Sequence, residues 1–460
     1  MTQPLPPVIV GAGPAGVRAA QTLLAHGLRP VLVDEAPRPG GQIYRQPPIG
    51  FSRPRSSLYG FEAARAASVH HAAERITPQI DYRPGTLVWN AAAGRLDLLH
   101  DGRTDSLPFS QLIVATGATD RVLPFPGWTL PGVYALGGAQ VALKFQGCAI
   151  GERVVFAGTG PLLYLVAWQY AKAGATVAAV LDTAPRGAKL AALPALARNL
   201  PVLAKGIYYS AWLRLHGVPV HEGVTLERAG GSGRVESVHW RQGGKAHEAS
   251  CDAVGFGYGL RPETQLADLL GCRFAYDELQ RAAVPLRDAA GRTSVPGVYV
   301  AGDGAGIMGA DAAEWAGERA ALALLADAGG AVDAARGQQL EAQLARTAAF
   351  RRGLERAFPF PADWAAQAPD DLVVCRCEEV TAGQLRQCVR DSGAAEMNRL
   401  KALTRVGMGR CQGRMCGAAA AEILAQATGR PTAEVGRLRG QMPIKPLPFA
   451  AVATARGAAR

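Results

Sequence analysis

The chain has 460 residues, of which 48% are hydrophobic, 19% are charged and 55 are glycine; this is the composition of a soluble α/β protein with about two to four domains. Its net charge is +11, but the basic residues are mostly scattered arginines without a lysine-rich run. That pattern argues against a nucleic-acid-binding protein and favours a basic surface suited to acidic cofactors or partners. The most apolar stretch, residues 154–180, is interrupted by glycines, Gln169 and Lys172, so the sequence predicts no transmembrane helix.

The N-terminal segment combines a buried strand, a glycine-rich turn and a helix. Three apolar residues, 8–10, run directly into the pattern G-x-G-x-x-G, and a helical pattern follows. Gly11 permits a tight turn, Gly13 lets the backbone approach a pyrophosphate, and Gly16 lets the helix pack closely on the strand. The N-terminus of the helix offers unpaired N–H groups to the phosphates. The segment therefore predicts a dinucleotide site formed by Gly11, Gly13, Pro14, Ala15 and Gly16.

The second predicted strand ends in two acidic residues, Asp34 and Glu35. In dinucleotide-binding folds an acidic side chain at this point accepts a hydrogen bond from a ribose. We expect Glu35 rather than Asp34 to do so. The turn-rich stretch 39–45 follows and should lie beside the nucleotide, with Gly41 and Gln42 as its candidate binding residues.

The next part of the chain completes a first nucleotide unit. Residues 61–75 read as a helix, and short alternating strands follow between residues 86 and 99. Another buried strand, 112–115, ends in Thr116 and Gly117. This Ala-Thr-Gly turn resembles the one that closes the first half of the FAD domain in flavoproteins with two dinucleotide-binding domains.

A second strand, turn and helix begin at Val154. Gly158 and Gly160 repeat the first two glycines of the fingerprint, and a second strand leads to Asp182. Leu163 occupies the third glycine position, where it should hold the helix away from the strand and narrow the space for a pyrophosphate. We therefore expect a second Rossmann unit in which NAD(P) binding is doubtful and a purely structural role is favoured.

A later strand runs into Gly302 and Asp303, and a small-residue helix spans residues 312–326. In flavoproteins of this architecture an aspartate at such a strand end binds the ribityl chain of FAD. Capping of the following helix is the alternative role for Asp303. Its combination with Gly11 and Thr116 favours the flavin role.

Four cysteines follow a proline-containing linker in the arrangement C-x-C and C-x4-C: Cys375, Cys377, Cys411 and Cys416. They can converge only if the intervening chain folds back, and predicted helices over 381–390 and 394–403 would allow this. A reducing compartment is expected for a chain without an evident leader, so these residues read as thiols or metal ligands. Four thiolates suit a structural zinc or a [2Fe–2S] cluster. The tight C-x-C pair and the upstream flavin motifs favour the cluster over zinc and over unligated thiols.

Positive groups should surround these cysteines. Cys411 precedes a helical pattern over 418–427, whose N–H groups would face a negatively charged cluster. Arg376, Arg410 and Arg414 would add to this effect. The remaining cysteines are expected to be core thiols: Cys148, Cys251, Cys272 and Cys388.

The cysteine segments 375–381 and 405–416 resemble the [2Fe–2S] domain of the bacterioferritin-associated-ferredoxin type. From Val8 to about residue 430 the chain resembles the FAD-containing A or α subunits of opine oxidases, D-hydroxyproline and L-proline dehydrogenases, and the middle subunit of hydrogen cyanide synthase. The resemblance includes residues 40–45 and the replacement of the third fingerprint glycine by Leu163.

The resemblance implies an α/β fold in which a Rossmann-like FAD domain carries an inserted NAD(P)-like domain and is followed by a small α-helical [2Fe–2S] domain. We expect six segments: the first part of the FAD domain (1–150), the NAD(P)-like domain (151–260), the FAD return segment (261–345), a linker (346–370), the [2Fe–2S] domain (371–430) and an extended tail (431–460). The tail is expected to dock on a partner.

The resemblance also implies an electron-transfer role within a heteromeric complex. FAD accepts two electrons and can release them singly, whereas a [2Fe–2S] cluster carries one at a time. By the same resemblance, amine oxidation belongs to a separate flavoprotein β subunit. The resemblance is also compatible with a small ferredoxin-like subunit and with a further flavin at a subunit interface.

We assign no catalytic residue to this chain. No C-x-x-C or C-x4-C lies between the first strand and the second Rossmann unit, which excludes a disulfide reductase, and no histidine follows His247 to act as a base. The expected donors are D-hydroxyproline, proline or an opine. The alternatives are glycine oxidation for cyanide production, a self-sufficient NAD(P)H-dependent flavin reductase, and a non-enzymatic scaffold with a structural zinc and a vestigial flavin fold. The expected location is the cytoplasm, with the inner face of the membrane as a variant of it.

Overall fold

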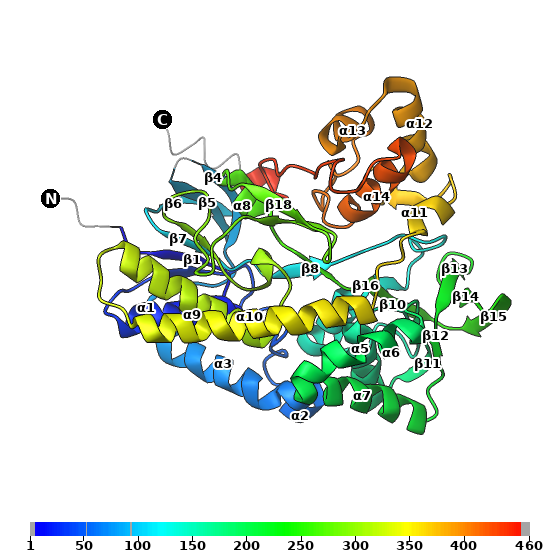
Figure 1. Cartoon of the computed structure of the whole chain (residues 1–460), viewed down its shortest axis with the longest axis horizontal. Helices are drawn as coiled ribbons and strands as arrows, with labels where there is room; N and C mark the ends of the chain where they lie inside the picture. Colours follow the sequence, from blue (N-terminus) through cyan, green and yellow to red (C-terminus); the bar gives the residue numbers. More distant parts are fainter. Residues whose placement is uncertain (1–4, 52, 93, 452–460) are drawn as a thin grey trace.

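A computed structural model of the chain describes residues 5–51, 53–92 and 94–451. Two α/β units lie side by side, and a small helical unit packs above the second (Figure 1). None of the helices within the described residues is long and apolar enough to cross a membrane.

The first unit is built on a five-stranded parallel sheet in the order β20-β7-β1-β2-β3. Its strands are β1 (Val8–Val10), β2 (Val31–Val33), β3 (Asp81–Arg83), β7 (Leu112–Val114) and β20 (Val298–Val300). Successive side chains of a strand point to opposite faces. Ile9 and Ile113 therefore join one apolar core, while Val8 and Val10 join another. Both faces of the sheet are covered, as is usual for parallel sheets.

Helices cover one face of this sheet and an antiparallel sheet covers the other. The helices are α1 (Pro14–Ala25), α2 (Arg55–Tyr59), α3 (Ala63–Ile76) and α9 (Ala310–Asp327). The covering sheet consists of β4 (Leu87–Ala92), β5 (Arg95–His100) and β6 (Arg103–Pro108), and α8 (Gln265–Leu269) packs near it. The predicted helix over 61–75 and the strands between 86 and 99 are confirmed.

The second unit repeats this plan with a parallel sheet in the order β12-β11-β10-β16-β9. Its strands are β9 (Val133–Ala135), β10 (Arg153–Thr159), β11 (Thr176–Asp182), β12 (Val220–Glu222) and β16 (Ala253–Tyr258). Its helices are α4 (Leu136–Val141), α5 (Pro161–Lys172), α6 (Arg186–Leu196) and α7 (Leu200–Leu215), and β13 (Val224–Gly230), β14 (Ser237–Gln242) and β15 (Lys245–Ser250) form a side sheet. Because β9 pairs with β16, this unit begins before residue 133, and the expected boundary at 150 is wrong.

Two connections join the units. The short strands β8 (Ala118–Asp120) and β17 (Leu260–Pro262) form an antiparallel pair where the chain leaves and re-enters the first unit. The hairpin β18 (Phe274–Asp277) and β19 (Ala282–Pro285) follows β17. The single helix α10 (Ala334–Ala357) packs on both α9 and α6. Its residues favour helix and Asp333 caps it, so the expected linker over 346–370 is wrong for its first half.

The helical unit contains β21 (Val373–Cys375), β22 (Val380–Thr381), α11 (Trp364–Gln367), α12 (Ala382–Ser392), α13 (Met397–Thr404) and α14 (Gly417–Thr428). Thr381 and Gln384 form a capping box at the start of α12, and Gly393 ends it with a positive φ. Both the cap and the stop were predicted. The second helix begins at Met397 rather than at residue 394, because Glu396 caps it.

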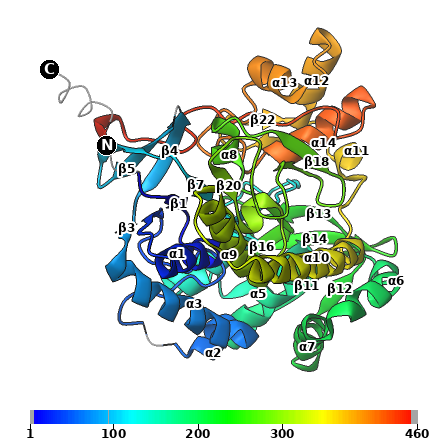
Figure 2. The same cartoon turned by 60° about the vertical axis from the view of Figure 1, so that its left-hand side comes forward.

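The C-terminal segment 431–451 packs on the chain itself, as the second view shows (Figure 2). Ile444 is buried, and its N–H donates to the Trp89 carbonyl at 3.0 Å. Part of the predicted tail thus packs on the chain itself, and its docking on a partner stays a prediction. Residues 452–460 lie outside the described part.

A prediction concerns the contact between α1 and α9. A Cβ on Gly317 would lie 2.0 Å from the Ala15 carbonyl oxygen, so we expect Gly317→Ala to lower the free energy of unfolding by about 1–3 kcal/mol. The control is Gly187→Ala in α6, where a Cβ meets nothing within 4 Å and alanine should be neutral or stabilising. Thermal unfolding of the full chain measures both. An unchanged midpoint for Gly317→Ala would contradict the close approach of α9 to α1.

Candidate cofactor sites

The turn between β1 and α1 has the geometry that a dinucleotide pyrophosphate requires. Gly11 has a φ of +108°, and a Cβ on Gly16 would lie 1.7 Å from its carbonyl oxygen. No side chain caps α1, whose first residues are Pro14 and Ala15. The free N–H groups at this helix start are thus available to a phosphate.

The stretch after β2 lies against this turn, as expected. A Cβ on Gly41 would lie 2.9 Å from the Gly13 Cα, and the Gly40 N–H donates to the Ala12 carbonyl at 2.9 Å. Gln42 is exposed and accepts a hydrogen bond from Arg45 at 2.8 Å. The structure therefore brings Gly41 to the predicted site and leaves Gln42 at its edge.

The two acidic residues after β2 differ in position. The Asp34 carboxylate accepts hydrogen bonds from the Ala12 N–H in the turn and from the Ala36 N–H at 2.6 Å, and burial raises its pKa. The Glu35 side chain is 53% exposed and pairs with Lys445 at 2.8 Å. The Asp34 carboxylate is thus already engaged by backbone N–H groups, and Glu35 stays the predicted ribose acceptor. Asp34 points to the glycine turn, whereas Glu35 points to the C-terminal segment.

The predicted flavin-binding groups after β7 and β20 lie together because these strands are adjacent and parallel: Thr116, Gly117, Gly302 and Asp303. A Cβ on Gly304 would lie 3.0 Å from the Thr116 hydroxyl. One oxygen of Asp303, Oδ1, accepts the N–H groups of Met308 and Gly309 at 2.8 and 3.0 Å, just before α9 begins. These bonds fix the turn before α9, which has no side-chain cap, so the alternative capping role is not observed. Within the described chain Oδ2 keeps its capacity to accept from a ligand.

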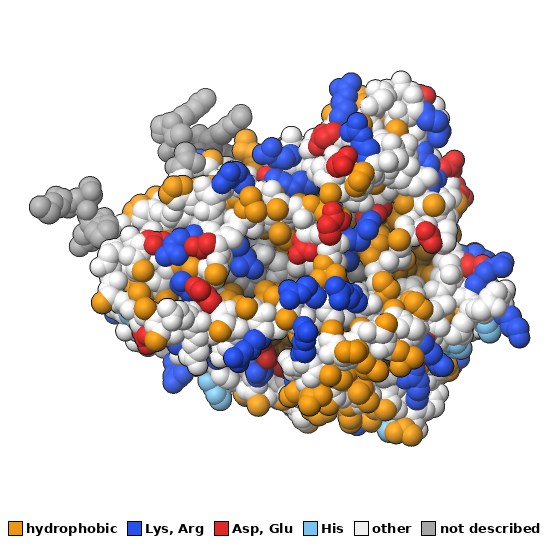
Figure 3. All heavy atoms as spheres, in the orientation of Figure 1, with side chains coloured by type: hydrophobic (Ala, Val, Ile, Leu, Met, Phe, Trp, Pro, Cys, Tyr) orange, Lys and Arg blue, Asp and Glu red, His pale blue; other side chains and the backbone are white. Residues whose placement is uncertain are grey.

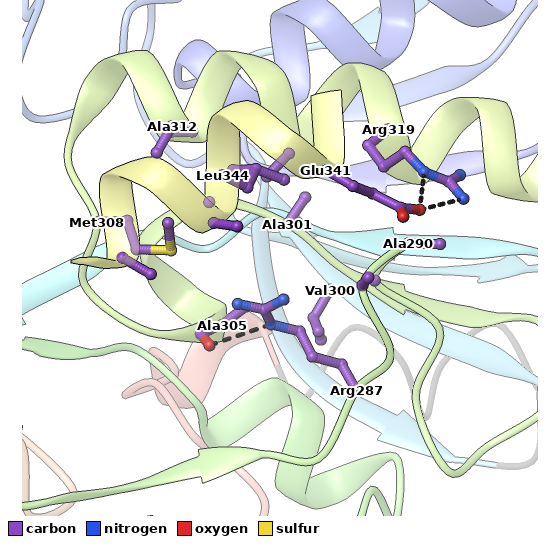
Figure 4. A pocket seen from close by; sticks show the side chains of 17 residues that line it. Arg287, Ala290, Val300, Ala301, Ala305, Met308, Ala312, Arg319, Glu341 and Leu344 are labelled. Atoms are coloured by element: carbon purple, nitrogen blue, oxygen red, sulfur yellow. Dashed lines mark hydrogen bonds and ion pairs between the residues drawn. The ribbon is translucent and has the colours of Figure 1, made fainter. Parts of the chain in front are cut away.

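A pocket of about 230 Å³ lies behind Gly302, between α9 and α10 (Figure 4). Nine of its seventeen lining residues are alanines, five of them on these two helices, and its charged pair, Arg319 and Glu341, is joined at 2.8 Å. The Arg287 Nε donates to the Ala305 carbonyl at 3.3 Å. Because these charges are already engaged, the pocket is not assigned to a cofactor.

The second Rossmann unit differs at both positions that would bind a nucleotide. Leu163 is completely buried in the core, at the position where Gly16 of the first unit lies against the Gly11 carbonyl. Asp182 is also completely buried, and its carboxylate accepts hydrogen bonds from Tyr164 at 2.7 Å and Lys189 at 2.5 Å. The acid that would bind a ribose is thus occupied within the protein.

The four candidate ligand cysteines form one cluster of thiols. The Cys416 thiol donates to the sulfurs of Cys375 and Cys411, and Cys377 and Cys411 are also hydrogen-bonded. These contacts, with backbone N–H groups, lower the pKa of Cys375 to about 6 and that of Cys411 to about 5. Thiolates are the form that binds iron. Across the described residues, no group of three or more potential ligands has the geometry of a single bound metal ion.

Backbone geometry around the thiols also fits an anionic cluster. The Cys375 sulfur accepts N–H groups of Gly407, Glu378 and Cys377, and the Cys411 sulfur accepts those of Met415 and Gly413. A Cβ on Gly409 would lie 2.2 Å from the Cys377 Cβ. Only glycine at position 409 therefore lets the segment before Cys411 approach the segment that carries Cys377. Such N–H donors stabilise charge on sulfur.

The predicted positive groups are arranged differently from expectation. The helix start lies at Cys416, which precedes α14, and not at Cys411. Arg376 stacks over the Trp128 ring at 5.4 Å, Arg410 is exposed, and Arg414 pairs with Glu263 at 2.6 Å. Of the other cysteines, Cys251 and Cys272 are buried and Cys388 is half-buried, but Cys148 is exposed, so the core assignment is wrong there.

The sequence missed a segment between the two cofactor sites. The Arg261 guanidinium contacts the Gly413 carbonyl at 3.4 Å, Gln265 donates to the Gln412 carbonyl at 2.5 Å, and Glu263 binds Arg414. These residues lie more than 140 positions before their partners. No local motif marks them, so only the folded chain could reveal the contacts.

Comparison with protein-family models defines the class. Residues 6–317 match the family "pyridine nucleotide-disulphide oxidoreductase", and residues 373–426 match the "BFD-like [2Fe-2S] binding domain". The protein is therefore a flavoprotein oxidoreductase whose cofactors are FAD and a [2Fe–2S] cluster.

Relatives define the family within this class. The chain is 38% identical to the A subunit of opine oxidase from Rhizobium meliloti, over 97% of this chain and 86% of the relative. It is 37% identical to the HcnB subunit of hydrogen cyanide synthase from Pseudomonas aeruginosa, over 97% and 98%. The chain belongs to the family of these oxidase subunits.

Solved structures agree with the fold. L-proline dehydrogenase from P. horikoshii covers 97% of this chain and 79% of its own, with a TM-score of 0.70 and 20% identity. Thioredoxin reductase from T. acidophilum matches 70% of the chain and 97% of its own, with a TM-score of 0.52 and 24% identity. These likenesses support the flavoprotein fold and its additional domain.

A prediction for the second Rossmann unit uses NADH. Because Asp182 is engaged and Leu163 replaces glycine, we expect NADH to leave the flavin absorbance of the purified protein unchanged during the time in which dithionite bleaches it completely. Rapid bleaching by NADH or NADPH would instead support the self-sufficient reductase.

A prediction for the cluster uses single Cys→Ser substitutions. Replacement of Cys375, Cys377, Cys411 or Cys416 should lower the iron and labile sulfide content severalfold, because each removes one thiolate ligand. Cys388→Ser is the control, since among described side chains that thiol hydrogen-bonds with Ser392 at 3.6 Å and with none of the four candidate ligands. A zinc-loaded, iron-free protein, or a ligand variant with full iron content, would contradict the assignment.

Proposed function

We propose that this chain is the electron-transfer subunit of a heteromeric dehydrogenase for an amino or imino acid of the D-hydroxyproline, proline or opine type. It relays electrons from a partner flavoprotein subunit to an acceptor. When bound, FAD accepts two electrons and releases them singly, and the cluster carries one at a time. The names of the relatives, which are subunits of oxidases, support the heteromeric assembly.

The observation that carries the proposal is the position of Glu263. Its carbonyl accepts the Thr116 hydroxyl at 2.7 Å, and its N–H donates to the Gly117 carbonyl at 2.9 Å. Its carboxylate receives two hydrogen bonds from Arg414, at 2.6 and 3.2 Å. One residue thus contacts both the candidate flavin turn and the loop between Cys411 and Cys416.

This bridge is an ion pair with little exposure. The side chains of Glu263 and Arg414 are each 13% exposed. Burial alone would raise the pKa of Glu263, but Arg414 and Arg261 hold it below its usual value. Removing one partner of such a pair typically costs about 3–5 kcal/mol, because the other charge remains buried. The pair therefore resists separation of the two domains, and with it any change in the distance between the cofactor sites.

The same picture assigns substrate oxidation to the partner. The sequence contains no histidine after His247, so the return segment of the flavin domain offers no imidazole base. We accordingly assign no catalytic residue here, and the flavoprotein β subunit, with a small ferredoxin-like subunit, completes the proposed complex. We place it in the cytoplasm or at the inner face of the membrane.

Glycine oxidation is the alternative, because HcnB relatives have nearly the same identity as the opine oxidase relatives. The purified complex decides between them. Dye reduction with D-hydroxyproline, proline or an opine supports the main proposal, whereas cyanide formation from glycine supports the alternative. Glu263 and Arg414 have the same role in either case.

A prediction tests the bridge. In Glu263→Gln we expect the rate of electron transfer from photoreduced flavin to the cluster to fall at least tenfold, because the cluster loop is no longer fixed against the flavin turn. FAD and iron contents and the EPR spectrum of the reduced cluster should be retained. Flash photolysis of the full chain measures the rate.

The matched control is Glu422→Gln. Glu422 of α14 pairs with Arg281 at 2.5 Å, so it also joins the cluster domain to the flavin domain but does not contact the Thr116 turn. We expect its transfer rate to stay near that of the unaltered chain. Equal rates in all three proteins, with intact cofactors, would overturn the role of Glu263.

A further inference from the structure

The helices α6 and α7 carry an unusual apolar surface. Eight of the sixteen exposed large apolar side chains of the described residues gather here. Leu215 is 84% exposed, Leu190 66% and Leu200 64%. We define the α6–α7 surface by these eight: Phe61, Leu190, Leu193, Leu200, Val202, Ile207, Tyr208 and Leu215. Apolar side chains cover this lower face of the molecule (Figure 3).

The sequence of α7 explains why this face is uncovered. Apolar residues occur all around the helix, yet only Tyr209 and Leu213 are buried by the rest of the chain. A helix that is apolar on all sides is normally enclosed, and large exposed apolar patches mark interaction sites. The chain itself supplies cover for only one side of α7.

The charges near this surface indicate what kind of partner fits. No acidic residue occurs between Asp182 and Glu222, so the basic residues of this segment outnumber the carboxylates with which they pair. Arg186, Lys189 and Arg214 converge on Glu222, at 2.8, 2.6 and 3.1 Å. Only Lys189 also reaches Asp182, so three positive charges share two carboxylates and the edge of the surface stays positively charged. The surface therefore suits a protein partner whose apolar face has acidic residues at its rim.

The surface belongs to both nucleotide units. The Phe61 ring contacts the Tyr208 ring with centroids 4.9 Å apart, and Lys205 pairs with Glu62. Both views place α7 at the opposite end of the molecule from α12 and α13 of the cluster domain (Figures 1 and 2). A protein bound at α7 would thus contact the flavin unit and leave the cluster domain free.

We propose that the α6–α7 surface is the docking site of the partner flavoprotein subunit, which presents to it an apolar face with an acidic rim. This inference rests on the proposed function, because it assumes a heteromeric complex. A stable interface of this kind buries about 800 Å² on each partner, and the exposed leucines would form its apolar centre.

Charge-introducing variants test the surface in the full chain, co-expressed with the flavin-containing subunit of its complex. We expect Leu200→Glu and Ile207→Glu to weaken assembly at least tenfold, because each buries a carboxylate in an apolar interface. The controls are Leu403→Glu and Met442→Glu, at side chains that are 44% and 66% exposed elsewhere; these should assemble normally. Native mass spectrometry measures the assembled fraction.

A second measurement does not depend on how the variants fold. A photo-crosslinking residue at Leu215 should join the unaltered complex to the flavoprotein subunit, while one at Leu403 should not. Normal assembly of both surface variants overturns the proposal. So does self-association of this chain, or binding to vesicles containing phosphatidylglycerol, that the variants abolish while the complex stays intact.

The relay proposal and the docking proposal fail separately. Flash photolysis of the isolated surface variants should give the transfer rate from flavin to cluster of the unaltered chain. If the unaltered chain shows no such transfer, the relay fails whatever the assembly result. If the transfer rate is normal and the surface variants assemble as the unaltered chain does, only the docking proposal is refuted.

Discussion

The buried ion pair of Glu263 with Arg414 joins the flavin turn to the cluster loop, together with the contacts that Arg261 and Gln265 make with the same loop. Glu263 is fixed on one side by backbone and hydroxyl contacts to the Thr116–Gly117 turn, and on the other by a bidentate guanidinium. A bidentate ion pair fixes the relative orientation of its two side chains in addition to stabilising their contact. The cluster loop is consequently held in one position relative to the flavin unit. Secondary pairs, such as Arg281 with Glu422, stabilise the same contact farther away.

The two Rossmann units share a fold but differ at two positions of the nucleotide fingerprint. In the first, Gly16 lets α1 begin against the Gly11 carbonyl. In the second, the buried Leu163 occupies the third glycine position, and Asp182 is held by Lys189. The parallel sheet and its covering helices survive both changes, because the apolar core does not depend on the glycine turn. Fold alone therefore does not establish a nucleotide site.

The sequence predicted features whose partners are close along the chain, and failed where the partners are distant. The glycine turn, the capping box of Thr381 and the C-x-C pair depend on neighbours within a few residues, so their spacing is readable. The Arg414 side chain was assigned to the cluster, but its carboxylate partner lies 151 positions earlier. The linker was misread because α10 has only four large apolar residues, Leu340, Leu344, Phe350 and Leu354, to signal its packing against the rest of the chain. The side chains of Asp34 and Glu35 point in different directions at a strand end, which spacing alone does not fix.

The four candidate ligand cysteines differ in their exposure to solvent, which indicates where an electron acceptor can approach in the proposed relay. Among the described residues, Cys375 and Cys416 are buried, Cys411 is half-buried and Cys377 is exposed, so the four thiols are most accessible on the Cys377 side. The proposed docking surface on α6 and α7 lies at the other end of the molecule. An electron donor bound there and an acceptor near Cys377 would not compete for space. Electrons that enter at the flavin unit would then pass to the cluster domain before they leave. Glu263 joins these two parts, so transfer from the donor to the acceptor depends on its contact with Arg414.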